Sequence, residues 1–352
     1  MNAAVGEVMD RLGDGHWVNA ATGDLTEVGR VSARKMWATL GRMADYSVHA
    51  IGWAPRYTAY LSVAMTGPAL YRDLVIWTVG AVTSRRMVVH VHRGELSGLT
   101  PHGLWAPLQR WLIRRSEFWV LGSALVAPLR AFGAVNVHVV HNGVTCASPH
   151  HGEGRLAVQT AAESGELGPG GEEAGMSVVF LGHHFRSKGV DAAAEIVEML
   201  RDEPFSWTFA GSVVEPDTEA MLRPLEHLGS RYRRIEAVDA DVRCRLLHRS
   251  DVLLLPSHNE GSPLVLIEAM EHGVVPIVSS RGCMPEMVGE VGAVCDTLDE
   301  YAEAIRLLAK DGGELAQRSA AATSRWRECY SRASFEHRVT DLLSGSAGAR
   351  LE

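Results

Sequence analysis

The chain has 352 residues, of which 46% are hydrophobic and 22% are charged, and its formal net charge at pH 7 is −8. This composition is typical of a globular protein that is long enough for two domains, each with its own core. The negative net charge argues against a general nucleic-acid surface, although it allows a local basic pocket.

The cysteines and the N-terminal segment indicate in which cellular compartment the protein is expected. Five cysteines without a CxxC pair predict reduced thiols in a cytoplasmic protein, without a metal or disulfide framework. Residues 1–15 have no apolar core, so we expect no signal peptide. No uncharged run reaches the roughly 20 residues that cross a bilayer.

The first half of the chain alternates strand and helix patterns. Residues 16–21 are predicted as a strand, followed by a loop with Thr22 and Gly23 and by a helix over about residues 31–43. Further strands are predicted at residues 46–51, 87–91 and 137–140. Such alternation indicates a parallel α/β sheet, and ligands bind at the carboxyl ends of its strands. We therefore expect ligand contacts at the Thr22–Gly23 loop and at residues 92–94.

Residues 104–115 form one helical pattern with two open interpretations. Apolar side chains fall at helical spacing beside three arginines, and a basic amphipathic helix of this kind binds membrane surfaces. This interpretation predicts peripheral contact with the inner membrane face. The alternative, which is the more common one, is a stripe that packs into the core while the arginines face solvent.

A change of composition divides the chain. Residues 148–175 are dominated by Gly, Glu, Ala and Pro without an apolar period, which predicts a flexible linker or exposed insertion between domains at 1–147 and 176–333. The second half repeats the alternation, with strands at 177–181, 207–210, 234–238, 251–255 and 274–278 and helices at 190–200, 216–228, 242–249 and 285–288. A crossover helix and tail are predicted at 334–352. We predict two Rossmann-like parallel-sheet domains facing across a ligand-binding cleft.

The segment 257–270 contains the most informative helix start. Ser262 is expected as its N-cap, with Pro263 at the first helical position, where its missing N–H does no harm. The amides of Leu264 and Val265 would then point out of the helix start. The helix dipole and these unpaired donors favour an anion such as phosphate.

Two carboxylates flank this helix start. Glu260 precedes it, and Glu268 lies inside an apolar run, on the same helical face as Leu264. A buried acid without a partner is costly, so Glu268 either pairs internally or faces a polar ligand. Spacing alone leaves a ligand site and a capped core helix equally open.

The loop at residues 182–189 follows a strand and opens a helix. Its amides and cations can converge on phosphate, with Lys188 as a mobile point charge. The GxxxxGK[ST] order is absent, which disfavours an ATPase. A second acidic motif, Asp239-Ala240-Asp241, resembles a metal-binding DxD but stands before a helix, where acids serve as caps, so we expect capping and no essential metal.

In combination, these motifs resemble the donor domain of family-4 retaining glycosyltransferases with the GT-B fold. The resemblance covers residues 176–345 almost continuously, and the two glutamates separated by seven residues are that family's signature. It is carried by Gly182, Lys188, Gly189, Ala210, Gly211, Ser250, Asp251, Pro256, Ser257, Glu260, Gly261, Ser262, Pro263, Glu268, Ala269, Met270, Gly273, Pro276, Pro285 and Glu286. The first half matches more loosely, through residues 90–94 and 140–144.

The resemblance implies a role for each matching residue. Glu268 would bind the ribose hydroxyls of a nucleotide sugar, Glu260 would face the transferred sugar, and Lys188 would neutralise the leaving diphosphate. His92 would lie beside the sugar near the reaction centre. Further donor contacts are implied for Thr22, Gly23, Gly182, His183, Arg186, Val238, Gly261, Ser262, Leu264 and Val265.

The implied activity is retaining, metal-independent transfer of a hexose-type sugar from a nucleoside diphosphate to an acceptor hydroxyl. The first domain would bind the acceptor, which is a glycan, a lipid-linked saccharide or a small molecule. No cofactor is expected beyond the nucleotide-sugar co-substrate. His183 stands where the family usually has Arg, and Arg93 where it has Gly. The alternatives are a nucleotide-sugar-binding protein without transfer activity and a nucleotide-sugar epimerase, which the glutamate pair disfavours.

Overall fold

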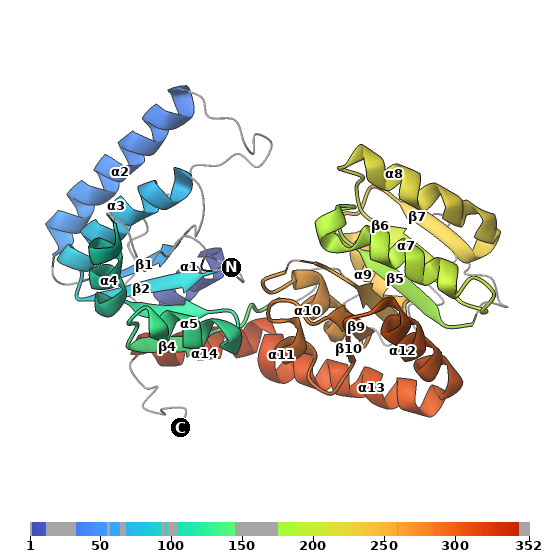
Figure 1. Ribbon diagram of the computed structural model, residues 1–352. Coiled ribbons are helices and arrows are strands. Elements are labelled where there is room, and N and C mark those ends of the chain that lie inside the picture. Colours follow the sequence, from blue (N-terminus) through green and yellow to red (C-terminus); the bar gives the residue numbers. More distant parts are fainter. Residues whose placement is uncertain are drawn as a thin grey trace. The chain divides into compact units, whose positions relative to one another are not determined.

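The structure, a computed structural model, describes residues 2–11, 33–54, 57–63, 68–92, 96, 105–144, 175–258 and 260–344. The chain divides into two compact units, Met1–Val140 with Glu336–Glu352 and His141–Phe335. Each unit has its own parallel sheet with helices packed on it (Figure 1). The prediction of two α/β parallel-sheet domains is confirmed. The predicted strand at 16–21, Thr22, Gly23, Arg93 and residues 148–174 lie outside the described residues.

The first unit contains a four-stranded sheet in the order β1-β2-β3-β4. Its strands are β1 (Thr58–Ser62), β2 (Arg86–Val91), β3 (Glu117–Val120) and β4 (Asn136–Val139). Its helices are α1 (Asn2–Arg11), α2 (Ala33–Trp53), α3 (Pro68–Thr83), α4 (Ala106–Arg115), η2 (Ser123–Leu125) and α5 (Val126–Ala131), and α14 (Arg332–Ser344) runs from the second unit back into the first. β2 is buried from Met87 onward, as expected for a strand covered on both faces.

The strand predicted at residues 46–51 is wrong, because this segment belongs to helix α2. Met43, Tyr46, Ser47 and Ala50 are the shielded positions, while Val48 and Ile51 are exposed. This spacing of three, four and seven residues is one face of a helix. The local apolar pattern suggested a strand, but the longer helical period decides the structure.

Helix α4 packs its apolar stripe into the core. Leu112 and Ile113 are fully buried, and Leu108 packs against the same cluster. Trp111, which the stripe also included, is 42% exposed beside the exposed Arg110. The core-packing interpretation therefore holds for Leu108 and Leu112, while Leu104 lies outside the described residues and membrane contact stays a prediction. No described helix has the length and apolar content needed to span a membrane.

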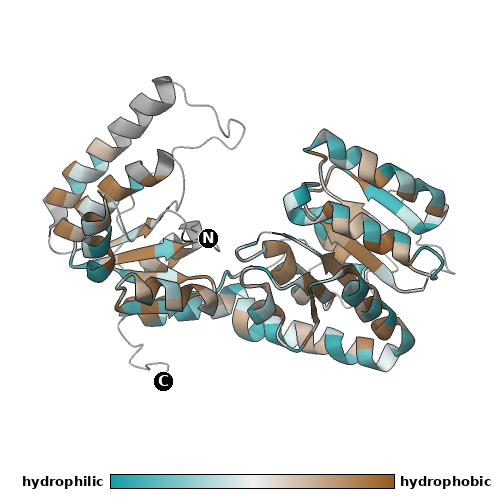
Figure 2. Ribbon diagram, in the orientation of Figure 1, coloured by the Kyte–Doolittle hydropathy of each residue, from teal (hydrophilic) through white to brown (hydrophobic). Residues whose placement is uncertain are grey.

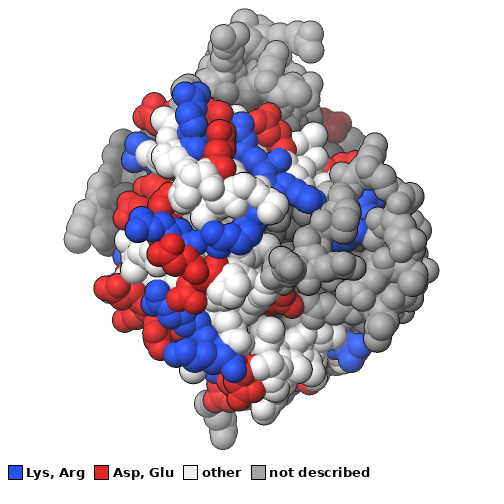
Figure 3. Space-filling model, turned by 90° about the vertical axis from the view of Figure 1, so that its right-hand side faces the viewer, with Lys and Arg blue, Asp and Glu red and all other residues white. Residues whose placement is uncertain are grey.

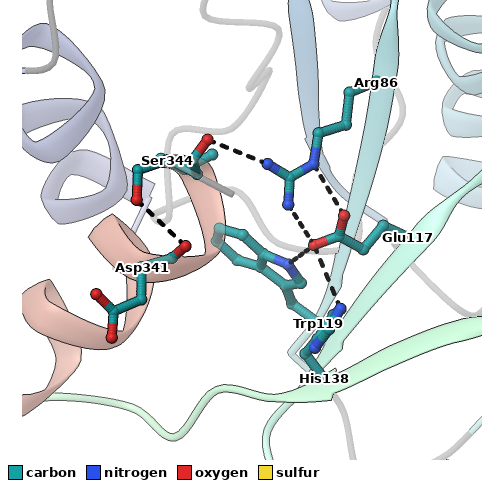
Figure 4. Close-up of polar contacts among 7 residues, drawn as sticks. Arg86, Glu117, Trp119, His138, Asp341 and Ser344 are labelled. Atoms are coloured by element: carbon teal, nitrogen blue, oxygen red, sulfur yellow. Dashed lines mark hydrogen bonds and ion pairs between the residues drawn. The ribbon is translucent and has the colours of Figure 1, made fainter. Parts of the chain in front are cut away.

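A polar network ties helix α14 to the first sheet (Figure 4). The Arg86 guanidinium donates two hydrogen bonds to the Glu117 carboxylate, at 2.8 and 2.7 Å, and a third, at 3.4 Å, to the Leu343 carbonyl. Trp119 Nε1 donates to the same carboxylate at 2.7 Å, and His138 Nε2 lies 3.7 Å from it. The two-pronged arginine–carboxylate contact joins β2 to β3, and the single hydrogen bond from Arg86 to Leu343 connects the end of α14 to this pair.

The second unit contains a six-stranded parallel sheet in the order β10-β9-β8-β5-β6-β7. Its strands are β5 (Ser177–Leu181), β6 (Ser206–Ala210), β7 (Tyr232–Ile235), β8 (Val252–Leu255), β9 (Val275–Ser279) and β10 (Ala293–Cys295). Its helices are η3 (Arg186–Lys188), α7 (Val190–Met199), α8 (Pro216–Leu222), η4 (Arg223–Arg231), α9 (Ala240–His248), α10 (Leu264–Glu271), α11 (Met284–Val288), α12 (Leu298–Lys310), α13 (Gly312–Arg325) and η5 (Trp326–Tyr330). This strand order is that of a Rossmann fold.

Two apolar clusters cover the two faces of this sheet. Alternate residues of β5 divide between them, with Val178 and Phe180 in one and Val179 and Leu181 in the other. The first cluster includes α7 and α12, and the second includes α9, α10 and α11. Figure 2 shows hydrophobic strands inside and hydrophilic helix surfaces outside. Both faces of the sheet are therefore core.

The surface of the second unit mixes charges of both signs. Figure 3 shows Lys and Arg side chains interspersed with Asp and Glu. Arg234, for example, pairs with Glu219 at 2.9 Å and with Glu236 at 2.5 Å. Exposed pairs of this kind contribute little to stability, because water and salt screen the two charges.

Among the described cysteines, Cys244 departs from the prediction. Cys283, Cys295 and Cys329 are free, as predicted, but Cys244 is disulfide-bonded. Burial raises the pKa of the Cys283 and Cys295 thiols to about 11. These two thiols are therefore unreactive core residues at neutral pH.

Candidate functional site

The strand order of the second sheet, by itself, indicates where a ligand would bind. The chain runs from β5 outward through β6 and β7, then returns to the other side of β5 and continues through β8 and β9. Ligands of such sheets bind outside the carboxyl ends of the strands, at the point where the order reverses. The loops at 182–189 and 256–263 leave β5 and β8 at that point.

The loop at 256–263 is held between two other loops. On one side it bonds the loop after β5, and on the other the loop after β9. The four hydrogen bonds are His258 N to Ser187 O at 3.0 Å, Ser257 Oγ to Lys188 O at 3.2 Å, Cys283 N to Gly261 O at 3.0 Å and Ser279 Oγ to Ser257 O at 2.5 Å. Three strand ends therefore converge on the segment that carries Glu260.

Two glycines permit this convergence. Gly282 has φ +60°, and a Cβ there would lie 1.8 Å from the carbonyl oxygen of Glu260. Gly189 has φ +75°, and a Cβ there would lie 2.0 Å from the carbonyl oxygen of Pro256. Any other residue would strain the backbone and push the loops apart.

Lys188 and Glu260, 72 positions apart in the sequence, meet in this site. Lys188 Nζ forms an ion pair with Glu260 Oε1, and the Ser257 hydroxyl lies 3.4 Å from the same oxygen. The Glu260 side chain is only 8% exposed, whereas that of Lys188 is 36% exposed. A cation and a carboxylate with different solvent access thus face one another at the predicted position.

Helix α10 begins one residue later than predicted. Pro263, with φ −68° and ψ 123°, is the N-cap, so the prediction that Ser262 caps the helix is wrong. The Ser262 hydroxyl is used elsewhere, because it donates to Met287 Sδ and accepts from Asn142 Nδ2, at 3.5 and 3.4 Å. The amides of Leu264 and Val265 still belong to the first turn, where helices leave N–H groups without internal acceptors.

Glu268 has an internal partner, Arg243 on α9. Arg243 Nε lies 3.0 Å from Glu268 Oε2, and the Glu268 side chain is 13% exposed. Burial raises the pKa of Glu268, and the Arg243 charge opposes that shift. Arg243 is absent from the sequence prediction. The available signal was its spacing, since it lies three and four residues before Leu246 and Leu247, which are buried.

The other predicted donor residues lie around the loop after β5. His183 is exposed, and its ring meets that of Phe185 edge-on with centroids 6.2 Å apart. Arg186 is exposed, and its backbone amide donates to Glu215 Oε2 at 2.9 Å. Gly182 is half-buried, and Val238 packs against the second apolar cluster. The structure thus brings Gly182, His183, Arg186 and Lys188 into one loop at the strand end.

His92 belongs to the first unit, directly after β2. Its ring lies 4.1 Å from that of His90, centroid to centroid, and burial lowers its pKa to about 4. His90 is fully buried, and its Nδ1 is 2.7 Å from the Tyr60 hydroxyl. A His92 ring with this lowered pKa is neutral at pH 7, so it can donate or accept a hydrogen bond but supplies no fixed positive charge.

The DxD motif serves the helix. The Asp239 side chain accepts a hydrogen bond from the Val242 amide at 2.8 Å and is the N-cap of α9, as predicted. Asp241 pairs with Arg245, four residues later, at 3.2 Å. Among the described residues no group of three or more His, Cys, Asp or Glu side chains could hold a metal ion.

Comparisons with known proteins agree with this geometry. Residues 175–311 match the family described as "Glycosyl transferases group 1". The chain is 27% identical over 288 residues to the glycogen synthase of Mycobacterium tuberculosis, an alignment that covers 79% of this chain and 63% of the relative.

Solved structures extend the likeness to almost the whole chain. A glycosyltransferase from Rickettsia africae superposes with a TM-score of 0.71 at 11% identity, over 99% of this chain and 94% of that one. HepE of Anabaena in complex with UDP superposes with a TM-score of 0.64 at 16% identity, over 87% and 82% of the two chains. The chain has the GT-B fold. The strand-end site in its second unit thus lies within the segment that matches glycosyl transferases.

Proposed function

We infer that this GT-B chain is a retaining glycosyltransferase that moves a hexose-type sugar from a nucleoside diphosphate to an acceptor hydroxyl. The observation that carries the proposal is the convergence of three strand-end loops on the Lys188–Glu260 pair, beside the start of α10. A cation, free amides and a carboxylate at one site suit a ligand with both diphosphate and sugar hydroxyls.

The donor assignment follows the chemistry of each group. The carboxylate of Glu268 suits ribose hydroxyls, since it accepts more than one hydrogen bond. Glu260 faces the transferred sugar in this proposal. Lys188 and the amides of Leu264 and Val265 bind the diphosphate.

The reaction places charge where the site can stabilise it. The bond between the anomeric carbon and the phosphate oxygen breaks, which leaves an oxocarbenium-like sugar and a diphosphate. Fixed cations and amides stabilise that leaving group, and such electrostatic stabilisation is usually the largest contribution to catalysis. The acceptor oxygen bonds to the anomeric carbon on the same face, and its proton passes to the leaving phosphate oxygen. No carboxylate nucleophile is needed, in contrast to a retaining glycosidase.

Metal independence belongs to the same proposal. Asp239 is engaged as a helix cap, and Lys188 with the α10 amides supplies the positive charge that a metal would otherwise bring. We expect transfer to continue in the presence of a chelator. Activity lost on chelation and restored by a divalent cation would overturn this part.

The first test is binding of a panel of nucleotide sugars by calorimetry, followed by product analysis with candidate acceptors. UDP and UDP-glucose head the panel because the neighbour HepE is solved with each of them. We expect one donor to bind, to be slowly hydrolysed and to be transferred with retained anomeric configuration. Binding without hydrolysis or transfer to any acceptor would favour a nucleotide-sugar-binding protein, which His183 in place of the family's arginine also favours.

Peripheral membrane contact is the remaining part of the proposal. Trp105 and Trp111 are exposed on and beside α4, together with Arg110 and Arg114. This composition is typical of helices that lie in a membrane interface. Flotation with anionic vesicles tests it, and equal recovery with neutral and anionic vesicles would contradict an electrostatic contact.

A further inference from the structure

The Arg243–Glu268 pair connects two helices of the second unit at the edge of the candidate donor site. Arg243 comes from α9 and Glu268 from α10, and the two side chains are 35% and 13% exposed. The pair is therefore partly shielded from solvent, on the helix whose first turn belongs to the site.

The ion pair occupies only some of the donors of the Arg243 guanidinium and some of the acceptor positions of the Glu268 carboxylate. Arg243 approaches through Nε, which lies 3.0 Å from Oε2. Among the described residues, no other hydrogen bond or ion pair involves the Arg243 guanidinium or the Glu268 carboxylate. A guanidinium has five N–H donors and a carboxylate about four acceptor positions, so both groups retain capacity for a ligand.

Stability alone does not account for this pair. Replacing a buried ion pair by apolar residues of similar size is often neutral or stabilising. On helix α10, Glu268 is flanked by the buried residues Leu266, Ile267, Ala269 and Met270, and its own side chain is 13% exposed. A charged pair in this setting points to a ligand that needs the carboxylate.

We propose that Arg243 is a positioning residue of the donor site, which holds Glu268 so that its carboxylate accepts hydrogen bonds from both ribose hydroxyls of a ribonucleoside diphosphate. This inference rests on the proposed donor function of Glu268. It adds a specific consequence, because the pair then distinguishes ribonucleotides from deoxyribonucleotides.

The test compares ribo and deoxy ligands on wild type and on three variants. UDP, GDP and ADP are titrated first, and the tightest binder is carried forward with its 2′-deoxy and 3′-deoxy forms. The variants are Arg243→Met, Arg243→Lys and the matched control Arg245→Met. Arg245 lies on the same helix but pairs with Asp241, at 3.2 Å.

We expect wild type and Arg245→Met to bind the ribonucleotide roughly tenfold to a hundredfold more tightly than either deoxy form, the range expected for hydrogen bonds to a charged group. In Arg243→Met this preference falls towards one, while the deoxy forms keep their wild-type affinity. Arg243→Lys restores part of the preference, because a lysine supplies charge without the planar guanidinium. A general loss of structure would instead weaken all three ligands alike.

The outcomes separate the two claims. If wild type prefers the ribonucleotide and Arg243→Met keeps the full preference, the role of Arg243 is overturned and the donor site stands. If Arg243→Met does not fold, a full preference in Arg243→Lys overturns the role equally. If wild type binds none of the three diphosphates, the proposed function itself is overturned, and this inference with it.

Discussion

The loop at 256–263 and helix α10 are adjacent in the chain, yet they hold their carboxylates in different ways. Glu260 lies in a loop and pairs with Lys188, a partly exposed side chain from another loop. Glu268 lies on a helix whose other side is core, and it pairs with Arg243 of the neighbouring helix. The difference indicates two tasks. A lysine that can exchange partners suits a group that changes during a reaction, whereas an arginine between two helices suits a fixed contact.

The largest effect is expected at the Lys188–Glu260 pair. Lys188→Met removes the cation at the proposed leaving group, so we expect the transfer rate to fall by roughly 10²–10³-fold, the usual cost of losing one such stabilising group. Initial rates with saturating donor measure it. Lys188→Arg keeps the charge and serves as the control. Equal rates in wild type and Lys188→Met would show that the loop pair has no catalytic part.

His184 lies in the loop at 182–189 that carries Lys188, and it allows the stability of this loop to be tested apart from its proposed role in catalysis. His184 is fully buried, neither ring nitrogen has a partner among the described residues, and burial lowers its pKa to about 4. The unfolded chain takes up this proton near pH 6.5, so the stability held by the neutral ring is complete above pH 6.5 and is lost as the pH falls towards 4. The loss is about 3 kcal/mol.

Urea unfolding of wild type and His184→Leu at pH 7 and pH 4.5 measures this effect. We expect the variant to lose less stability on acidification than wild type. His337→Leu, at a position whose side chain is 80% exposed, provides the comparison substitution. Parallel pH profiles for wild type and His184→Leu would contradict the prediction.

A smaller effect is expected from His183→Arg, which adds a permanent charge beside Lys188. A histidine is charged only below about pH 6.5 unless its surroundings change this, so the gain should appear above neutral pH. We expect donor affinity to rise by up to about tenfold at pH 8, which corresponds to about 1.4 kcal/mol. Donor titrations of wild type and His183→Arg at pH 5.5 and pH 8 measure this gain. Equal affinities of the two proteins at both pH values would contradict the prediction.

The smallest effect concerns the stability of the fixed pair. Burial raises the pKa of Glu268, so folding disfavours its charged form at neutral pH, and the folded state regains stability as the pH falls through that raised pKa. Glu268→Gln carries no such charge. We expect its unfolding free energy to equal or exceed that of wild type at pH 7, with the difference shrinking towards pH 4. A large loss of stability at pH 7 would indicate that the role of Glu268 is purely structural.

The sequence was sufficient for much of the second unit. Strand β8, four buried aliphatic residues between loops, is legible from its apolar run, and Asp239 is legible as a cap from its place before a helix. Prediction from a short segment was wrong where a longer helical repeat determines the structure. The segment 46–51 has a strand-like alternation, but it lies within a helix whose buried face repeats over Met43, Tyr46 and Ala50.

The residues of the site could be identified from the sequence, but the contacts between them could not. The motif order identified Lys188 and Glu260, but their pairing depends on the loops after β5 and β8 meeting at the reversal of strand order. Arg243 was missed because its partner lies 25 positions away on another helix, and no local pattern marks a contact between two helices. Ser262 was misassigned as a cap because its hydroxyl has tertiary partners, Asn142 and Met287.

Calorimetric titration of wild type and Glu268→Gln with the same nucleotide sugar tests whether Glu268 binds the ribose of the donor. The substitution keeps the size of the side chain and removes the charge that the ribose hydroxyls would use. We expect the variant to keep its fold, judged by its unfolding free energy, and to bind the donor roughly tenfold to a hundredfold more weakly. Unchanged donor affinity in a variant of reduced stability would contradict it.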